Sequence, residues 1–195
     1  MVFFMRKSLS EKEQNSIKAK LISNCRFCWE RYGYRKTGVA ELASMSGIST
    51  GAFYSFFPTK EALFIATAND FLTKLYELMT ACRLQKPTKH DFAAGFKKCI
   101  DEMFENKWIF SLREDIETFL RKLPEDFLEH DFQQDLLDIS AIAGLYGLKA
   151  KVSMEEIVAV LHTLLMSIYL TDIIGTPHRQ ALYLLIDAVI GDLFE

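Results

Sequence analysis

Apolar residues recur at helical spacing from the N-terminal part of the chain onward. The first stripe of such residues consists of Ile17, Leu21, Cys25, Cys28 and Trp29. Steps of three, four and one place these side chains on a single face of an α-helix. Ser10, followed three residues later by Glu13, forms a capping box, in which each side chain can bind the other residue's backbone N–H. We therefore expect a first helix from about Ser10 to Tyr32.

The same spacing continues through the rest of the chain. A helix beginning at Lys60 should run to about Leu84, because its apolar residues alternate between steps of four and three. Thr88 can cap the following helix, and Pro124 and Pro177 each force a new start. With only four Pro and nine Gly, the chain leaves little room for long irregular loops. The pattern predicts an all-α fold of about nine helices.

The last two predicted helices are apolar on more than one face. One runs from Met154, after a capping box of Ser153 and Glu156, to about Ile174, and the other runs from Pro177 nearly to Glu195. One apolar face can be buried within a single chain, but a second face needs a partner. We therefore expect a homodimer with both helices at its interface. The residues predicted for this interface are Ile157, Leu161, Leu164, Ile168, Leu182, Leu185 and Val189.

The run from Ile157 to Ile174 is also long enough to raise the question of a membrane span. His162 and Asp172 interrupt it, and acidic residues rather than Lys or Arg precede it. We therefore expect a buried helix and no membrane partner.

The stretch from Gly33 to Phe64 predicts two short helices joined by a tight turn. Ser46 and Gly47 form a turn pair, because Gly tolerates the left-handed backbone of a sharp corner. Thr37 can cap the helix before the turn, and Ser49 can cap the helix that starts at Thr50. This is the helix-turn-helix pattern, whose second helix enters the major groove of DNA.

Sixteen positions in this stretch have a more specific spacing. They are Gly33, Tyr34, Thr37, Val39, Leu42, Ala43, Gly47, Ile48, Ser49, Gly51, Phe53, Tyr54, Phe57, Lys60, Glu61 and Leu63. This pattern resembles the DNA-binding domain of the TetR (tetracycline-repressor) family of bacterial transcriptional regulators. The chain departs from the usual pattern at Gly38, Ser46 and Phe56.

The resemblance implies a three-helix DNA-binding domain over residues 1–65 and a helical bundle for effector binding and dimerisation over residues 66–195. It implies a regulator, most simply a repressor, that leaves a palindromic operator when a small molecule binds. From the chemistry of the side chains we expect an apolar or aromatic effector. The alternative is an all-helical protein-interaction module that does not bind DNA.

Two groups of residues are the candidates for contact with DNA. They are Arg35, Lys36, Thr37 and Lys60 for the phosphates, with Ser49, Thr50, Gly51, Ala52, Tyr54, Ser55 and Phe56 on the recognition helix. The recognition helix carries no Arg, Lys, Asn or Gln, the side chains that bind purine edges in pairs of hydrogen bonds. We therefore expect modest base readout, with specificity coming largely from phosphate positions, DNA shape and dimer spacing.

The charge of the chain is divided unevenly. Residues 1–65 hold ten Lys or Arg against five Asp or Glu, whereas the remainder holds 13 against 21. A basic head on an acidic body suits a DNA reader, because phosphate neutralisation dominates affinity. Charged faces that merely keep both parts soluble are the simpler alternative. Arg6 and Lys7, in an N-terminal arm, could touch DNA or belong to a frayed terminus.

The four cysteines, Cys25, Cys28, Cys82 and Cys99, are too scattered for a disulfide scaffold. Cys25 and Cys28 spell a C-x-x-C motif, but no second pair or nearby His completes a metal site, and both lie on the core stripe. We expect structural cysteines, no metal, no cofactor and no enzymatic activity. Since no secretory signal opens the chain, we expect a cytoplasmic protein.

No motif marks an effector pocket in the body. The bulky or hydrogen-bonding residues that could line one are Phe96, Trp108, Phe119, His162, Met166 and Tyr169. Each of them could equally be an ordinary core residue.

Overall fold

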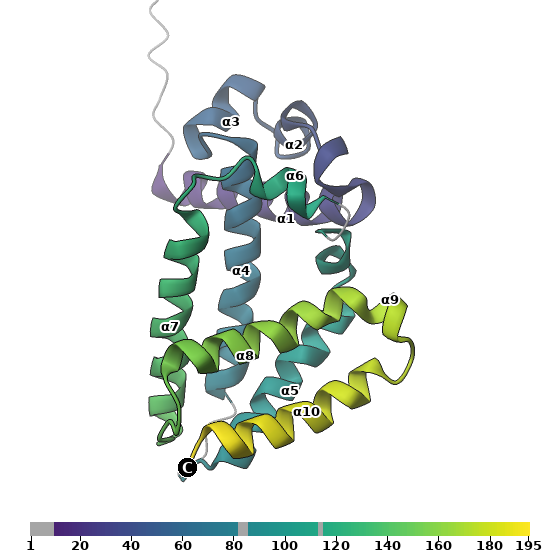
Figure 1. Cartoon of the computed structure of the whole chain (residues 1–195). Coiled ribbons are helices and arrows are strands. Elements are labelled where there is room, and N and C mark those ends of the chain that lie inside the picture. Colours follow the sequence, from purple (N-terminus) through teal and green to yellow (C-terminus); the bar gives the residue numbers. More distant parts are fainter. Residues whose placement is uncertain (1–9, 82–85, 113–114) are drawn as a thin grey trace, which may run out of the picture.

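The computed structural model describes residues 10–81, 86–112 and 115–195 (Figure 1). These residues fold almost entirely into helices, and the extended contacts among them amount to one isolated antiparallel bridge, between Ala150 and Phe194. The prediction of an all-α fold is confirmed. The predicted N-terminal arm with Arg6 and Lys7 lies outside the described residues.

Three helices form the end of the molecule that we call the head. They are α1 (Glu11–Lys36), α2 (Val39–Met45) and α3 (Thr50–Phe56). Figure 1 shows α2 and α3 at the end opposite the C-terminus. The capping box of Ser10 and Glu13 opens α1 as predicted. Gly33, at φ +76°, breaks the helix where its end was expected, and one further turn then continues to Lys36.

Helix α4 (Lys60–Ala81) runs from the head into the body. Its buried side chains, which include Phe64, Phe71 and Leu75, follow the predicted stripe. Cys82 and the predicted helix end at Leu84 lie outside the described residues. The expected domain boundary between residues 65 and 66 falls within this helix, so the two parts share a rigid element.

The remaining helices form the body. They are α5 (Lys89–Glu105), the 3₁₀ segment η1 (Lys107–Leu112), α6 (Ile116–Leu120), α7 (Phe127–Leu145), α8 (Met154–Ser167), the 3₁₀ turn η2 (Ile168–Leu170), α9 (Thr171–Ile174) and α10 (His178–Leu193). The capping boxes at Thr88 and Ser153 open α5 and α8. Gly175, at φ +90°, ends α9 and lets the chain turn back into α10.

An aromatic cluster joins the head to the body. Trp29 of α1 packs on Phe64 of α4 with ring centroids 4.5 Å apart, and on Trp108 of η1 at 5.0 Å. Phe119 of α6 meets the ring of Tyr34 edge-on at 5.3 Å. The buried core is therefore continuous between the two parts.

Helices α4, α5 and α7 approach one another closely at the far end of the body. The hydroxyl of Tyr146, the residue that follows α7, donates a hydrogen bond to the Met79 carbonyl of α4, at 2.5 Å. A side chain at Gly95 of α5 would meet Met79 Sδ at 3.1 Å, so only glycine fits this crossing without a shift.

Helix α10 contacts α5 and α8, and Figure 1 draws α8 in front of α4 and α5, with no described helix in front of α8 or α10. By length and composition Met154–Ile174 could cross a membrane, and 28% of it is buried. Its inner face, with Ile157 and Leu161, is buried, whereas Met166 and Ile173 are exposed. The expectation of a buried helix therefore holds for one face only.

Candidate DNA-binding interface

Helices α2 and α3 are joined by a tight corner at Gly47, which has φ +75°. The Ile48 N–H donates to the Ala43 carbonyl at 3.0 Å, which closes the end of α2. The Ser49 hydroxyl then accepts the Ala52 N–H at 3.1 Å and caps α3, as predicted. Two short helices are thus set at a fixed angle by local backbone chemistry.

The two faces of α3 differ sharply. Phe53 is fully buried and packs against Phe57 at 6.2 Å between ring centroids, as expected of core residues. The outer face of α3 exposes Thr50, Gly51, Tyr54 and Ser55. The capping residue Ser49 is also exposed. Two further residues of the helix are half-buried, namely Ala52 and Phe56. The hydroxyl groups of Thr50 and Tyr54 are therefore open to a partner.

Lys60, expected to contact phosphate, is already bound within the head. Its ammonium group donates to the carbonyls of Tyr34 at 2.7 Å and Thr37 at 3.1 Å, and lies 3.9 Å from the centroid of the Tyr34 ring. These carbonyls end α1, where the helix dipole is negative. Burial lowers the pKa of Lys60, while Glu61 opposes that shift. An ammonium has three N–H donors, so one remains for a phosphate.

Thr37 has a different role from the one expected. Its side chain is buried, and its hydroxyl donates to the Gly33 carbonyl at 2.8 Å. It therefore closes the end of α1 rather than capping α2, whose N-cap is Gly38 without a side-chain hydrogen bond. The prediction that Thr37 caps α2 is wrong, because its hydroxyl is bound to the Gly33 carbonyl in the last turn of α1 and α2 starts one residue later, after Gly38.

The neighbouring basic residues are not equivalent. Arg35 forms an ion pair with Asp115 of the body, with Nε 2.8 Å from Oδ1. Lys36 is exposed, and the described residues include no ion-pair partner for it. Close by, the Tyr34 hydroxyl donates to the Glu61 carboxylate. Burial, followed by Glu61, raises the pKa of Tyr34.

The C-x-x-C motif lies on the buried side of α1. Both thiols are free and fully buried. Burial raises the pKa of Cys25 to about 12, so that its thiol stays protonated at neutral pH. The Sγ atom of Cys28 lies 3.6 Å from Met45 Sδ. Both positions act as small apolar core groups in this geometry.

The six residues considered for an effector pocket are spread over several elements. Trp108 and Phe119 belong to the aromatic cluster between head and body, and Phe96 is buried in α5. The remaining three, His162, Met166 and Tyr169, lie on or directly after α8.

These three also differ in their surroundings. His162 Nε2 lies 2.7 Å from Asp135 of α7, and this hydrogen bond raises the pKa of His162. Met166 is 54% exposed, whereas burial raises the pKa of Tyr169. The spacing of these residues in the sequence does not show which of them face the core and which face the solvent.

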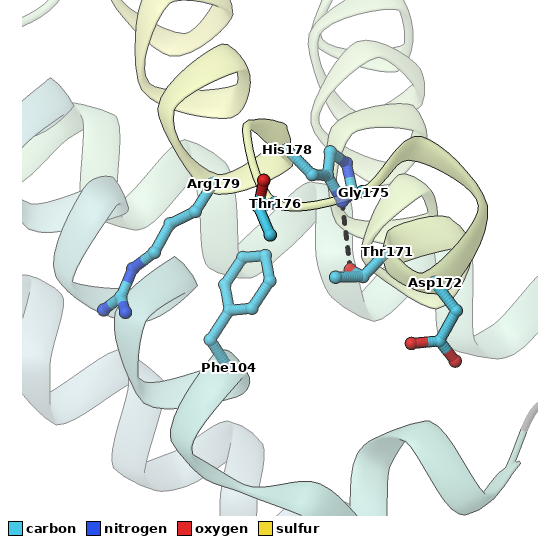
Figure 2. A pocket seen from close by; sticks show the side chains of 7 residues that line it. All are labelled: Phe104, Thr171, Asp172, Gly175, Thr176, His178 and Arg179. Carbon is cyan, nitrogen blue, oxygen red and sulfur yellow. Dashed lines mark hydrogen bonds between the residues drawn. The ribbon is translucent and has the colours of Figure 1, made fainter.

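An open cleft of about 410 Å³ lies instead where α9 turns into α10. It is lined by Phe104, Thr171, Asp172, Gly175, Thr176, His178 and Arg179. Figure 2 shows Phe104 pointing from α5 toward Thr176, while Asp172 points away. His178 Nδ1 is 2.9 Å from the Thr171 hydroxyl, and burial lowers the pKa of His178. The sequence predicts only a break between two helices at this turn.

The predicted dimer interface needs correction. Five of its residues are buried within the chain's own core and have no surface left for a partner: Ile157, Leu161, Leu164, Ile168 and Leu182. Val189 is half-buried, and Leu185 is 50% exposed. The apolar surface of these helices is made by other residues, namely Met166, Leu170, Ile173, Ile174, Leu184 and Leu185. We call these six residues the outer apolar face.

Comparison with known proteins agrees with this geometry. Residues 25–67 match the family model described as "Bacterial regulatory proteins, tetR family". In an alignment of 133 positions that covers 61% of the chain, it is 29% identical to the uncharacterised HTH-type transcriptional regulator YuxN of Bacillus subtilis strain 168. In an alignment of 114 positions that covers 52% of the chain, it is 27% identical to the HTH-type transcriptional repressor AcnR of Corynebacterium diphtheriae. The matches span 42% and 60% of these two relatives, so the chain matches less than two thirds of either.

The fold is shared over a greater length. The structure of SmeT, a repressor from Stenotrophomonas maltophilia, in complex with triclosan superposes with a TM-score of 0.60 and 16% identity. The superposition covers 92% of this chain and 92% of SmeT. The family model covers α2, α3 and the adjoining parts of α1 and α4, and the shared fold extends over the body as well. The family-model match, the related regulators and the shared fold together support a regulator of the TetR family.

Proposed function

We propose that the protein is a homodimeric transcriptional repressor that binds a palindromic DNA operator and leaves it when a small molecule binds. The observation that carries the proposal is the outer face of α3. This helix is capped and anchored from within by Phe53, and it presents Thr50, Gly51, Tyr54 and Ser55 to the solvent. A rigid helix with short side chains on its outer face can lie closely in a major groove.

Contacts to the DNA backbone contribute most of the affinity in this proposal. Lys60 has one remaining donor, Lys36 is exposed, and Tyr54 carries a hydroxyl on the outer face of α3. Such contacts fix the position of the head on the duplex without reading its sequence. The hydroxyl groups on α3 read bases only modestly, so that the distance between two heads sets much of the specificity.

The second copy is expected to dock on the outer apolar face. Leu184 is 72% exposed and Ile173 is 69% exposed, an unusual degree of exposure for large aliphatic residues in neighbouring helices. A two-fold axis through this face would bring α8 and α10 of both chains into a four-helix contact. In such a dimer both heads would face the same side of the assembly, as a palindromic operator requires.

The class of effector is inferred from the chemistry of the body and from a relative. The cleft at the turn between α9 and α10 combines the ring of Phe104 with the polar groups of Thr176 and Arg179. SmeT, which has the same fold, was solved with triclosan, and the structure of RolR, another neighbour, contains resorcinol. We infer a small apolar or aromatic effector and a cytoplasmic, non-enzymatic regulator.

Selection from a random duplex pool, followed by fluorescence anisotropy on the enriched DNA, tests the proposed function. We expect a palindrome whose half-sites are centred about 34–36 Å apart, one turn of DNA. The logarithm of affinity should fall linearly with the logarithm of salt concentration. Absence of both enrichment and salt-dependent binding would favour the interaction-module alternative. Adding triclosan or resorcinol to the bound complex then tests the effector class.

A further inference from the structure

Asp115, the residue just before α6, is a body carboxylate that binds the last turn of α1 in the head. Its Oδ1 lies 2.8 Å from Arg35 Nε, and its Oδ2 accepts the Arg35 backbone N–H at 3.2 Å. Arg35 Nη2 also donates to the Thr118 hydroxyl on α6, at 2.6 Å. Both the side chain and the backbone of Arg35 are thus held by the start of α6.

The backbone of the head is shaped to receive this carboxylate. Gly33 adopts φ +76°, and a Cβ atom there would lie 3.0 Å from Asp115 Oδ2. One turn further along α6, Phe119 packs against Tyr34 with ring centroids 5.3 Å apart. The contact between α6 and α1 therefore combines a close backbone approach, an ion pair and aromatic packing.

The two partners of the ion pair differ in exposure. The Asp115 side chain is 12% exposed, whereas that of Arg35 is 63% exposed. A buried carboxylate that lost its cation would remain as an uncompensated charge, which proteins strongly disfavour. Asp115 should therefore keep Arg35 as a partner even when another anion is close.

A DNA phosphate is the anion that Arg35 would otherwise bind. Arg35 adjoins Lys36 and the start of α2, on the basic part of the chain. Guanidinium groups bind carboxylate and phosphate oxygens with the same forked geometry. We propose that Asp115 competes with DNA phosphate for Arg35, so that α6 limits the affinity of the head for DNA.

This inference rests on the proposed DNA binding and adds a specific form of regulation to it. With α6 docked, the pair of Arg35 and Asp115 is neutral overall, and phosphate contacts come from Lys36 and Lys60. A change in the body that moved Asp115 would expose one further cation on each head. The body then has a second connection to the head, besides α4.

The salt dependence of DNA binding by the full-length chain tests this proposal. Asp115→Asn keeps the shape of the side chain and its capacity to accept one hydrogen bond, but removes the charge. We expect tighter binding and a slope of log affinity against log salt that is steeper by about 0.9 per protomer, because Arg35 now neutralises a phosphate. Lys36→Ala, the matched control, should reduce the slope by a similar amount.

The double variant separates competition from simple positioning. Arg35→Gln in the Asp115→Asn background should cancel the gain and restore the wild-type slope. If Asp115 instead orients Arg35 toward a phosphate, Asp115→Asn binds no more tightly than wild type and the double variant has a shallower slope, which overturns the proposal. Thermal melts show whether each variant folds.

If Asp115→Asn alone does not fold, the double variant still carries the test, since its slope should equal that of wild type. A slope shallower than wild type by about 0.9 per protomer would overturn the proposal. Failure of the wild-type chain to bind any duplex would instead refute the proposed function itself. The two failures are therefore distinguishable.

Discussion

The head and the body bury their apolar surface to different degrees. In the head, the large exposed apolar residues are Phe27, Tyr32, Met45 and Tyr54, most of them aromatic, and Arg31 lies over the rings of Phe27 and Tyr32. In the body, exposed aliphatic side chains lie on α7, at Leu128 and Leu137, and on α8, η2, α9 and α10, where they form the outer apolar face. The head completes its core within one chain, whereas the body leaves a face that a second copy could cover.

The two parts also keep their geometry in different ways. In the head, helices α2 and α3 are fixed by local devices, such as the Ser49 cap, the left-handed Gly47 and the Lys60 ammonium on the carbonyls that end α1. In the body, helices are fixed by side-chain packing, as at the crossing of Gly95, Met79 and Tyr146. A motif can specify the first kind of geometry, but packing can be achieved by many different sequences.

The largest effect is expected from a charge on the outer apolar face. Leu184→Glu should split the dimer and weaken operator binding by at least about 100-fold, since avidity between two linked heads is lost. Leu137→Glu on α7 is the matched control, because Leu137 is 66% exposed and Leu184 is 72% exposed. Light scattering and anisotropy measure the two effects. The expected difference between head and body would be refuted if the wild-type chain were a monomer, or if Leu184→Glu and Leu137→Glu weakened the dimer equally.

Truncating one buried side chain in each part should show which properties depend on the core of the head and which on the core of the body. Phe53→Ala and Phe92→Ala each remove a fully buried ring, at a cost of about 3–5 kcal/mol. Phe53→Ala should abolish DNA binding while the dimer persists, because the body does not depend on the core of α3. Phe92→Ala should lower the melting temperature of the body and weaken the dimer. Calorimetry with light scattering measures both outcomes, and loss of the dimer in Phe53→Ala would contradict the expectation.

Much of the head could be predicted because its determinants are close together in the sequence. The caps at Ser10 and Ser49, and the corner at Gly47, each depend on residues within a few positions of one another. Arg35 is different, since its partner Asp115 is 80 residues away and no spacing rule connects them.

The faces of the last two helices illustrate the same limit. Leu182 and Leu184 are both leucines in one helix, yet the first is buried and the second is 72% exposed. Two apolar faces of similar composition cannot be told apart without knowing the position of the neighbouring helix. The roles of Lys60 and Thr37 were missed because both bind backbone carbonyls at the end of α1, and a carbonyl acceptor is not marked by any residue type in the sequence.

Two left-handed glycines allow a closer comparison of the two parts. Gly33 and Gly147 have φ values of +76° and +66°, so alanine at either position should cost about 1–2 kcal/mol from the backbone alone. Gly33→Ala should cost more, because its Cβ would lie 3.0 Å from Asp115 Oδ2, whereas nothing lies within 4 Å of a Cβ at Gly147. Chemical denaturation measures the difference. Equal losses of unfolding free energy at Gly33 and Gly147 would mean that Asp115 and α6 move aside without cost, and that their contact does not fix the position of the head.

The smallest predicted effect is a dependence on pH that is confined to the body. The four histidines of the chain are His90, His130, His162 and His178, so none lies in the head. The pKa of His162 is raised by its hydrogen bond to Asp135, which means that the folded state holds the proton more tightly than the unfolded chain.

The sign of the pH effect follows from this raised pKa. The stability that His162 contributes should be fully present below its unfolded pKa of about 6.5 and should be lost as pH rises through the higher folded value. His162→Gln should therefore lower the melting temperature at pH 5.5–6, by a small amount because the pair is about one third exposed, and should change it least at pH 8. Asp135→Asn should reduce the same difference, since the protonated imidazole would lose its negatively charged partner. The salt slope of DNA binding should be the same for His162→Gln and wild type at either pH. If His162→Gln changed that slope, the protonation of a body residue would alter the DNA-binding surface directly. The division between a self-contained head and a packing-dependent body would then be wrong.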